Sequence, residues 1–433
     1  MALHVLVAGG GLGGLCLAQG LRKRGVSVAV YEREANLDTG QGFRIHINQA
    51  GSRALHECLP AELWDAFVLT AGVPCAGLGF LTEQMRELMF LEQRRIEGKA
   101  LDAPADPVTS EHPVSRVALR RVLLGGLHGV VHFGKELTRY EATAHSVRAF
   151  FADGSAADGD VLVAADGIGS SVRRQYLPQA RVSDTGIVAV GGKVPLDDLS
   201  RKWIPEPFVT RLNNVVPPRA CGMFIAPYVR KLDGARQDSN GASQHFQVDE
   251  LKDHVFWAFI AKRDKYALDA ELKSVGGRAL QALVGGMIER WHPDLVRLVS
   301  EAEPASVAAF RIQSAEPIGS WQSTRVTLLG DAIHAMTPLQ GLGGNTAFRD
   351  AALLCRRLVD VERGQSELLE AIGAYEKTMT RYAFDAVQLS RRIGDLAVSD
   401  GGFSRAMFKT VLRVVDGVAP LKQKLFGARQ PSE

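Results

Sequence analysis

Four short apolar runs of the sequence are each followed by glycine, by an acidic residue or by both. Continuous runs of Val, Leu and Ala, without regular alternation of apolar and polar residues, are typical of parallel strands buried on both faces of a sheet. The four runs are residues 3–8, 27–31, 161–164 and 326–329. We therefore expect an α/β fold in which these runs are strands.

The first run leads into the glycine motif G-x-G-x-x-G, formed by Gly9, Gly11 and Gly14. In a nucleotide-binding unit the first glycine makes the tight turn, the second lets the backbone approach a pyrophosphate, and the third lets helix and strand pack closely. A helix is predicted from about residue 12 to residue 24, with its free N–H groups facing the phosphates. Glu32 ends the second strand 18 positions after Gly14, close to the ~20-residue offset of a ribose-binding carboxylate. The stretch predicts an ADP-containing dinucleotide and leaves NAD and FAD open.

Two later segments place an aspartate near the carboxyl end of a predicted strand. Asp166-Gly167 follows the third run and precedes a short helix that begins near Ser170, and Gly330-Asp331 follows the fourth run. Ligands of open α/β sheets bind at the carboxyl ends of the strands. Taken alone, each pair is more readily interpreted as an ordinary turn. A glycine-rich loop then leads into a helix that we expect to begin at about Asn345.

Together, these three motifs resemble those of the flavoprotein monooxygenases of the p-hydroxybenzoate hydroxylase type, the single-component aromatic hydroxylases and epoxidases. That family carries a G-x-G-x-x-G, a central D-G motif and a C-terminal G-D motif in this order. The resemblance covers roughly residues 1–360. It implies a Rossmann-like FAD-binding domain with an inserted antiparallel β-sheet substrate domain and C-terminal helices. FAD would be the bound cofactor, and NAD(P)H and molecular oxygen would be co-substrates.

The same resemblance divides the chain into segments. The FAD-binding domain would comprise residues 1–72, 105–178 and 306–360, the substrate domain residues 73–104 and 179–305, and the C-terminal helical region residues 361–433. Within the second substrate segment, runs rich in Val, Ile, Phe and Trp favour antiparallel strands. These runs are residues 186–194, 221–228 and 254–261. Long helices are predicted over residues 366–396 and 403–415.

The resemblance also implies individual FAD contacts. Glu32 would bind the adenosine ribose, and the adjacent Arg33 is expected to contact the cofactor as well. Arg116, in the segment SRVALRRVLL, matches a family position that contacts FAD, and Arg120 is a second candidate. Asp166 with Gly167 would lie near the pyrophosphate, where the family also ties the aspartate to NAD(P)H binding. Asp331 would bond the ribityl or pyrophosphate region.

The loop before the predicted helix would wrap the isoalloxazine ring. Its expected contacts are Pro338, Gly341, Gly343, Gly344 and Asn345. Glycines suit a close approach of the backbone to a flat ring. The N-terminus of a helix carries roughly half a positive charge, which favours the anionic reduced flavin. These two properties support the placement independently of the family.

Two further candidates lie in the segment GQGFRIHINQAG at residues 40–51. Arg44 is a candidate cation near the flavin ring or the ribityl chain, both as a cofactor contact and as a catalytic residue. His46 is a catalytic candidate that could face the cavity. The alternative is that both are strand residues on a solvated face. His334 is expected to be a satisfied structural histidine, and the sequence names no general base.

As the resemblance implies, NAD(P)H would reduce FAD, oxygen would add at the C4a carbon to give a hydroperoxyflavin, and its terminal oxygen would be transferred to an electron-rich carbon. We expect hydroxylation of an aromatic or polyketide-like molecule. Epoxidation of an olefin on the same scaffold, a reductase of the geranylgeranyl reductase type, and a flavin-binding protein without turnover are the alternatives. Because only one complete G-x-G-x-x-G follows a strand, a second Rossmann domain for NAD(P)H is not expected, and the choice between NADPH and NADH stays open.

Bulk composition excludes some other classes. The formal net charge of +3 over 433 residues lacks the excess of positive charge of a nucleic-acid binder. Five scattered cysteines without a CxxC pair favour a reducing compartment and no metal site. The N-terminus lacks the pattern of a signal peptide. We therefore expect a cytoplasmic monomer or homodimer that does not act at a membrane.

Overall fold

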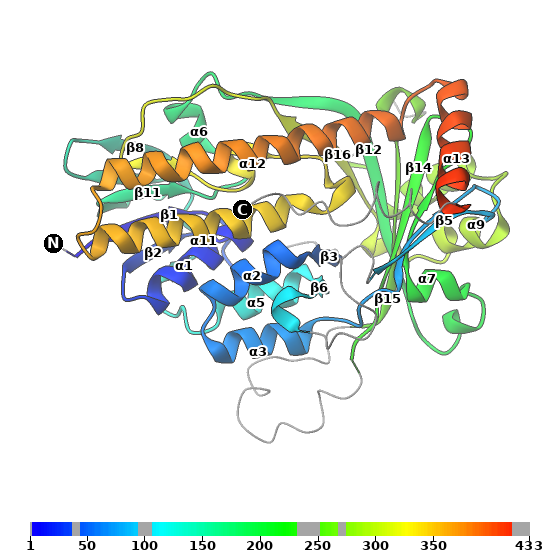
Figure 1. Ribbon diagram of the computed structural model, residues 1–433, viewed down its shortest axis with the longest axis horizontal. Coiled ribbons are helices and arrows are strands. Elements are labelled where there is room, and N and C mark those ends of the chain that lie inside the picture. The colour runs from blue at the N-terminus through cyan, green and yellow to red at the C-terminus, as the bar shows by residue number, and fades with distance from the viewer. Residues whose placement is uncertain (1, 37–43, 94–105, 232–251, 267–273, 418–433) are drawn as a thin grey trace.

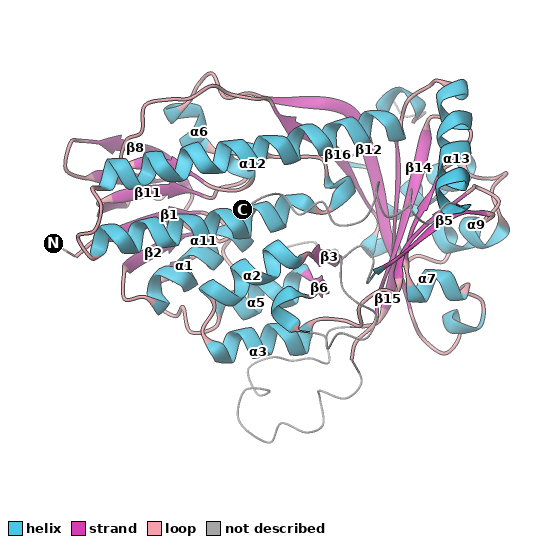
Figure 2. Cartoon of the chain, viewed as in Figure 1, coloured by secondary structure: helices cyan, strands magenta, loops and turns pink. Residues whose placement is uncertain are grey.

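The computed structural model describes residues 2–36, 44–93, 106–231, 252–266 and 274–417. Two halves lie side by side, one built on a parallel sheet with helices and the other on a large, mainly antiparallel sheet (Figure 1). The strands of the large sheet stand at one end of the molecule, and most helices gather at the other (Figure 2). The α/β fold class predicted from the sequence is confirmed.

The parallel sheet contains the four apolar runs as neighbours. Its strand order is β17-β11-β1-β2-β7, and neighbouring strands in it are parallel. The strands are β1 (His4–Ala8), β2 (Ser27–Tyr31), β7 (Val131–His132), β11 (Val161–Ala164) and β17 (Val326–Leu328). Every residue of β11 and β17 is buried, as expected for strands covered on both faces.

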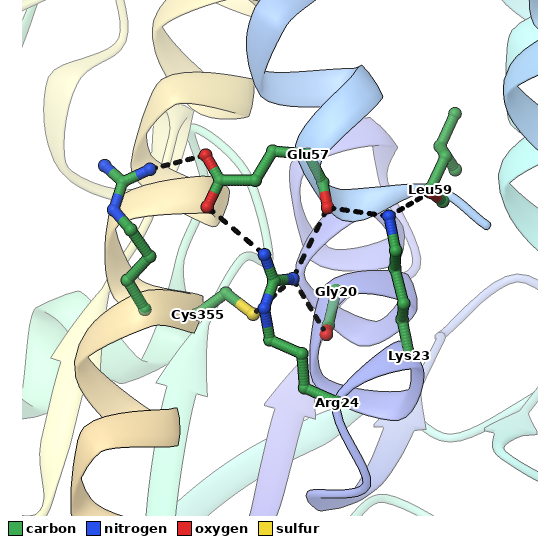
Figure 3. A network of polar contacts seen from close by, with 7 residues as sticks. Gly20, Lys23, Arg24, Glu57, Leu59 and Cys355 are labelled. Atoms are coloured by element: carbon green, nitrogen blue, oxygen red, sulfur yellow. Dashed lines mark hydrogen bonds and ion pairs between the residues drawn. The ribbon is translucent and has the colours of Figure 1, made fainter. Parts of the chain in front are cut away.

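Helices from distant parts of the sequence pack around this sheet. They are α1 (Leu12–Lys23), α2 (Gln49–Cys58), α3 (Ala61–Thr70), α5 (Arg116–Leu124), α6 (Ser171–Tyr176), α11 (Leu342–Glu362) and α12 (Leu368–Ala397). The helix α12 runs alongside both halves (Figure 1). At the ends of α1 and α2, Arg24 and Glu57 form an ion pair, and Arg24 also reaches the sulfur of Cys355 in α11 (Figure 3). This network fastens the three helices together at their outer edge.

Two small sheets complete the first half. The strands β8 (Leu137–Ala142), β9 (Val147–Phe151) and β10 (Ala156–Gly159) form an antiparallel sheet. The strands β3 (Arg44–Ile47) and β6 (His112–Ser115) form an antiparallel ribbon, in which Arg44 lies opposite Ser115. This β3–β6 ribbon carries the two candidate residues Arg44 and His46.

The large sheet has the order β16-β12-β15-β14-β13-β4-β5. Its strands are β4 (Gly77–Leu81), β5 (Glu87–Glu92), β12 (Val182–Pro195), β13 (Leu212–Val215), β14 (Cys221–Tyr228), β15 (His254–Lys262) and β16 (Ala308–Ala315). All its pairings are antiparallel except that of β13 with β4. The strand β16 belongs to this sheet although the sequence analysis assigned its segment to the FAD-binding domain.

The two faces of the large sheet have different neighbours. One face packs against α7 (Glu206–Thr210), α8 (Gly277–Met287) and α9 (Pro293–Ser300) through a core that includes Trp257 and Phe259. On the opposite face, Ile187 and Ile260 pack against Leu339 of the short 3-10 helix η9 (Pro338–Gln340). That second face therefore looks toward the glycine-rich loop. The C-terminal α13 (Gly402–Gly417) packs on β5 through Leu412 and Val415.

No helix in the described ranges is long and apolar enough to cross a membrane.

Candidate cofactor site and catalytic cluster

The predicted motifs meet at one edge of the parallel sheet. Asp331 follows β17, Asp166 follows β11, the glycine turn follows β1, and Glu32 follows β2. These four strands are consecutive neighbours in the sheet. With a strand spacing of ~4.8 Å, their ends form a row about 14 Å long. An elongated ligand can therefore contact all four motifs at once.

The three glycines of the first motif differ in what an added side chain would meet. Gly9 has φ +106°, and an added Cβ would lie 2.3 Å from the carbonyl oxygen of Ala165. A Cβ on Gly14 would lie 2.2 Å from the carbonyl oxygen of Gly9. A Cβ on Gly11 would meet nothing closer than 4.0 Å, so packing within the described chain does not require glycine there. A side chain on Gly11 would instead occupy the space in front of the helix, which is where a phosphate needs close approach.

The N-terminus of α1 is suited to an anion. Its N-cap is Gly11, which offers no side chain to accept from the first N–H groups. Uncapped N–H groups and the helix dipole together form a ready site for phosphate. The predicted helix start at residue 12 is confirmed.

Glu32 is buried beside the glycine turn. Its Oε2 accepts from the backbone N–H of Gly10 (2.8 Å), and its Oε1 accepts from that of Glu34 (2.9 Å). Arg120 of α5 approaches Glu32 Oε2 at 3.4 Å and Glu34 at 2.9 Å. Arg120 thus holds the carboxylate in place, and two carboxylate oxygens have further lone pairs for ribose hydroxyls. The side chain of Arg33 is exposed and has no hydrogen bond or ion pair among the described residues.

Asp166 has one oxygen satisfied and one not. Its Oδ2 accepts from the backbone N–H of Ser171 at 2.9 Å, whereas its buried Oδ1 has no partner in the described part of the chain. The next residue, Gly167, has φ +75°, and a Cβ there would meet nothing within 4 Å. A buried acceptor without a donor is costly, so a ligand with a hydroxyl or N–H group fits this position.

The glycine-rich loop differs in detail from the prediction. The helix α11 begins at Leu342, three residues before the expected start at Asn345. The cause is Gly341, which caps the helix in the left-handed conformation with φ +63°. The free N–H groups therefore belong to residues 342–344. A Cβ on Gly343 would lie 3.8 Å from Oδ1 of the exposed Asp331, so this loop lies beside the G-D motif.

The buried side chain of Asn345 fastens the loop to β3. Its Nδ2 donates to the carbonyl oxygens of His46 (2.8 Å) and Gly341 (2.7 Å), and its Oδ1 accepts from the N–H of Asn48 (2.9 Å). These bonds use the side chain of Asn345 to position the loop against β3. Pro338 is exposed at the start of η9, and Gly344 is exposed in α11.

Arg44 lies on the inner side of the β3–β6 ribbon. Side chains alternate along a strand, and Ile45 and Ile47 pack with the first core while Arg44 and His46 point to the other side. Only 8% of Arg44 is exposed, which rules out the solvated-face alternative for this residue. Its Nη2 contacts the sulfur of Cys75 at 3.6 Å, and its Nε has no partner. No carboxylate of the described chain forms an ion pair with it.

His46 forms a short bond to a residue that no sequence motif indicated. Its Nε2 lies 2.7 Å from Oε2 of Glu111, which also accepts from Nε2 of Gln93. Burial would raise the pKa of Glu111, but the hydrogen bond and charge of His46, with help from Gln93 and Arg44, hold that pKa below its ordinary value. The Nδ1 atom of His46 is buried without a partner. Arg44, His46, Cys75, Gln93 and Glu111 are called the junction cluster from here on.

The junction cluster lies between the two halves of the molecule. Burial lowers the pKa of His254, at the start of β15, to about 4, and the nearby charges of Lys193 and Arg44 act in the same direction. Cys75, which precedes β4, lines a cavity of ≈ 300 Å³ whose other walls are mostly Val, Pro and Ala. The positive charge of Arg44 therefore acts on His254 of the large sheet. The cavity beside Cys75, the thiol that Arg44 contacts, is mostly apolar.

Arg116 is exposed at the first position of α5, directly after Ser115 of the ribbon. Since Ser115 lies opposite Arg44, Arg116 is close to the junction cluster along the backbone. It makes no hydrogen bond or ion pair within the described ranges, so its side chain is available to a ligand.

The sequence profile of one family, described as FAD binding domain, matches residues 2–212 and 286–390. A dual O-methyltransferase/FAD-dependent monooxygenase of Cercospora beticola is 30% identical over 391 residues, covering 87% of this chain and 44% of that protein. The chain thus spans less than half the length of this relative.

Two solved structures are similar over nearly the whole chain. One, from Photorhabdus luminescens and assigned as an FAD-containing monooxygenase, is 34% identical with a TM-score of 0.77, covering 92% of this chain and 98% of that one. The other, Klebsiella pneumoniae HpxO complexed with FAD and uric acid, is 24% identical with a TM-score of 0.76, covering 98% and 97%. The second similarity shows the shared fold.

Proposed function

Because the chain belongs to the FAD binding domain family, we propose that it is an FAD-dependent, NAD(P)H-using monooxygenase that hydroxylates an aromatic or polyketide-like small molecule. The observation that carries this proposal is the row of four strand ends, where the glycine turn, Glu32, Asp166 and Asp331 lie in line. The space in front of Gly11 and the unsatisfied oxygen of Asp166 fit a dinucleotide.

Each part of FAD has a candidate partner along this row. Glu32, held by Arg120, would bind the adenosine ribose, and the N-terminus of α1 would bind the pyrophosphate. Asp166 and Asp331 would accept hydroxyl groups of the ribityl chain or lie beside the pyrophosphate. The uncapped N-terminus of α11 would face the isoalloxazine, where its partial positive charge stabilises negative charge on the reduced ring.

Bound FAD would supply the chemistry that amino acids lack, namely two-electron reduction by NAD(P)H and activation of molecular oxygen. The protein would bind, orient and exclude water. Arg44 would place a positive charge near the ring, and the large sheet would cover the reacting side. NADPH or NADH, the oligomeric state and a cytoplasmic location remain predictions.

The face of the large sheet that looks toward η9 supports an aromatic substrate. Phe224 lies opposite Ala258, and Phe256 lies opposite Ala226, on adjacent strands. Phe224, Phe256 and Ala258 are half-buried. Alternating aromatic and small side chains make a flat apolar surface that suits a ring. The uric acid bound by Klebsiella pneumoniae HpxO is likewise flat.

The test combines flavin content with turnover. The purified protein should carry FAD, and its reduction by NADPH without oxygen should be accelerated by one member of a panel of phenols, quinones and polyenes. Admission of oxygen should then give a product heavier by one oxygen atom. Absence of flavin, or reduction that no panel compound changes, would count against the proposal.

A pair of variants tests the cofactor row itself. Gly11→Ala places a methyl group in front of α1 and should weaken FAD binding at least about tenfold, without loss of folding. Gly285→Ala is the matched control, since a Cβ there also meets nothing within 4 Å and the residue lies in α8, on the far side of the large sheet. Equal FAD affinity in the two variants would contradict the placement of the pyrophosphate.

A further inference from the structure

A cavity of ≈ 300 Å³ lies at the rim of the large sheet, and none of the cofactor contacts proposed above accounts for it. It lies between the segment that leads into β4 and the ends of α7 and β14. Apart from Cys75 and Thr210, its described walls are Val, Pro and Ala side chains. On one side Val73 is 46% exposed, and on the other Pro227 is buried. The cavity therefore opens to the surface and also reaches inward.

The backbone holds this space open. At one end the N–H of Val73 donates to the carbonyl oxygen of Val229 at 2.7 Å, and at the other the N–H of Ala76 donates to that of Thr210 at 2.8 Å. Pro74 lies between these two bonds and has no N–H group with which to continue a ladder. The segment is thus fastened at both ends and stays apart from its neighbours in the middle, which makes the cavity a built feature of the fold.

The two polar side chains of the walls do not call for a polar ligand. The hydroxyl of Thr210 donates to the carbonyl oxygen of Glu206 at 3.1 Å. Burial raises the pKa of Cys75, against the opposing effect of Arg44, so this residue is a neutral thiol. No buried side-chain nitrogen or oxygen of the described walls lacks a hydrogen bond. Since apolar cavities without unsatisfied polar groups stay dry and take apolar ligands, this cavity favours a hydrocarbon group.

Cys75 connects the cavity to the region where the flavin ring is proposed to lie. This residue lines the cavity, and its sulfur lies 3.6 Å from Nη2 of Arg44, so the cavity is one side chain away from the junction cluster. Pro227 also lines the cavity and comes three residues after Phe224 in β14, about 10 Å along the strand. A ligand whose ring lies against Phe224 is therefore able to extend a substituent around the end of β14 into the cavity.

The volume of the cavity limits the size of that substituent. An apolar cavity of about 150 Å³ holds one benzene ring. The ≈ 300 Å³ at the rim of the sheet therefore holds about ten to twelve carbon atoms. Because the substituent has to turn around the end of a strand, a flexible alkyl or isoprenoid chain fits this path, whereas a rigid fused ring does not.

We propose that this cavity binds an apolar chain of the substrate while the aromatic ring of the same molecule lies against the flavin. The substrate is therefore an aromatic ring that carries an alkyl or isoprenoid chain of about ten carbon atoms. Val73 and Ala76 line the chain and determine which lengths are accepted. This inference rests on the proposed function and adds the substrate class. The cavity contributes affinity only, and no bond is formed or broken in it.

The first test measures affinity and needs neither NADPH nor oxygen. The FAD-loaded protein is titrated with phenol and with 4-alkylphenols of increasing chain length, and the change in the visible flavin spectrum reports that the ring has bound. Each added methylene should tighten binding about fourfold, and the gain should end at about ten to twelve carbons. An affinity that does not rise with chain length, or a chain that binds without a change in the flavin spectrum, would overturn the inference.

Variants of the wall locate the bound chain. Val73→Asp places a charge in the cavity and should weaken binding of 4-octylphenol at least about tenfold, with little change for phenol. Leu69→Asp is the matched control, because Leu69 is also 46% exposed and is not part of the described walls. Ala76→Phe adds a ring to the wall and should end the gain in affinity about six carbons earlier.

FAD content and melting temperature of each variant report folding separately. Equal losses of 4-octylphenol affinity in Val73→Asp and Leu69→Asp would overturn the placement of the chain. So would a chain-length limit that Ala76→Phe leaves unchanged, because the chain would then bind at another place.

The second test separates this inference from the proposed function. An octyl chain on a compound that the protein oxygenates should lower KM and leave kcat nearly unchanged, because the chain binds equally well in the ground state and in the transition state. Val73→Asp should raise KM for the octyl derivative only. A KM that the chain does not lower would overturn the inference and leave the monooxygenase proposal intact. Affinity that depends on chain length, without any oxygenated product, would refute the monooxygenase proposal alone.

Discussion

Two histidine–carboxylate pairs of this protein have nearly the same bond length and different surroundings. Nε2 of His334 lies 2.6 Å from Asp350, and Nε2 of His46 lies 2.7 Å from Glu111. The side chains of the first pair are 0% exposed, whereas those of the second are 24% and 14% exposed. Both rings leave Nδ1 without a partner among the described residues.

The two pairs differ more in the hydrogen bonds of their carboxylates than in those of their histidines. Asp350 also accepts from the backbone N–H of Gly330 (2.9 Å) and from the hydroxyl of Tyr382 (2.6 Å), so it ties β17, α11 and α12 together. Glu111 has Gln93 as its other described partner. A closed, multiply bonded pair stabilises the fold, whereas a pair that a ligand can reach is able to exchange a proton. The comparison teaches that the neighbours of such a pair, rather than its length, indicate its role.

The largest expected effect is on the stability of the closed pair. Asp350→Asn removes the charge that faces His334 and should lower the free energy of unfolding by about 3–5 kcal/mol, because one partner of a buried pair remains uncompensated. Glu111→Gln should lower it by no more than about 1 kcal/mol. Urea unfolding of both variants checks the difference, and equal losses would show that the two pairs are not distinct.

The next effect is a pH dependence of stability. Burial alone would lower the pKa of His334, but the charge and hydrogen bond of Asp350 raise it above its ordinary value, with a contribution from Asp331. A raised pKa in the folded state means that this stabilisation is complete below about pH 6.5 and is lost as pH rises through the folded-state pKa.

Melting temperatures measured from acid to alkaline pH should therefore show a decline above neutrality that His334→Gln removes. The total change in melting temperature over this pH range should be smaller than the decrease in melting temperature that Asp350→Asn causes. A wild-type slope that persists unchanged in His334→Gln would assign the titration to another group.

A smaller effect is expected at Tyr382. Tyr382→Phe deletes the hydroxyl that donates to Asp350 and should cost about 1 kcal/mol in unfolding free energy. The ring itself, which packs against the guanidinium of Arg349 at 3.9 Å, is retained. A loss as large as that of Asp350→Asn would mean that the hydroxyl, rather than His334, is the main partner of the carboxylate.

The smallest effect is expected at the surface network of Figure 3. Glu57 pairs with Arg24 and Arg356, and these three side chains are 23–50% exposed. Since exposed ion pairs contribute little, Glu57→Gln should change the free energy of unfolding by less than about 1 kcal/mol, and added salt should reduce the change further. A larger change in the free energy of unfolding would mean that this network stabilises the fold in the way the buried His334–Asp350 pair does.

The sequence predicted what depends on local pattern. Continuous apolar runs identified the strands of the parallel sheet, and the glycine motif with Glu32 18 positions after Gly14 predicted the dinucleotide turn. His334 was expected to be a satisfied structural histidine. It is fully buried against Asp350, although its Nδ1 has no partner among the described residues. The predicted start of α11 was wrong by three residues, because Gly341 takes the left-handed cap conformation, which residue spacing alone does not reveal.

What the sequence could not predict depends on contacts between distant segments. Glu111 lies 65 positions from His46 and 18 from Gln93, and no periodicity or motif links the three. Cys75 meets Arg44 through the packing of one half against the other. Arg120 was the second candidate after Arg116, yet it is Arg120 that lies 3.4 Å from Glu32. Which turn of α5 faces the site depends on how that helix packs, and the sequence does not show this packing.

In the proposed function, this protein transfers oxygen from dioxygen to a small molecule by means of FAD. The most direct measurement supplies isotopically heavy dioxygen, NADPH and the panel compound that most accelerates flavin reduction, and then weighs the product. One heavy oxygen atom per product molecule is the predicted result. A product whose new oxygen comes from water, or a reduced product without new oxygen, would contradict the account.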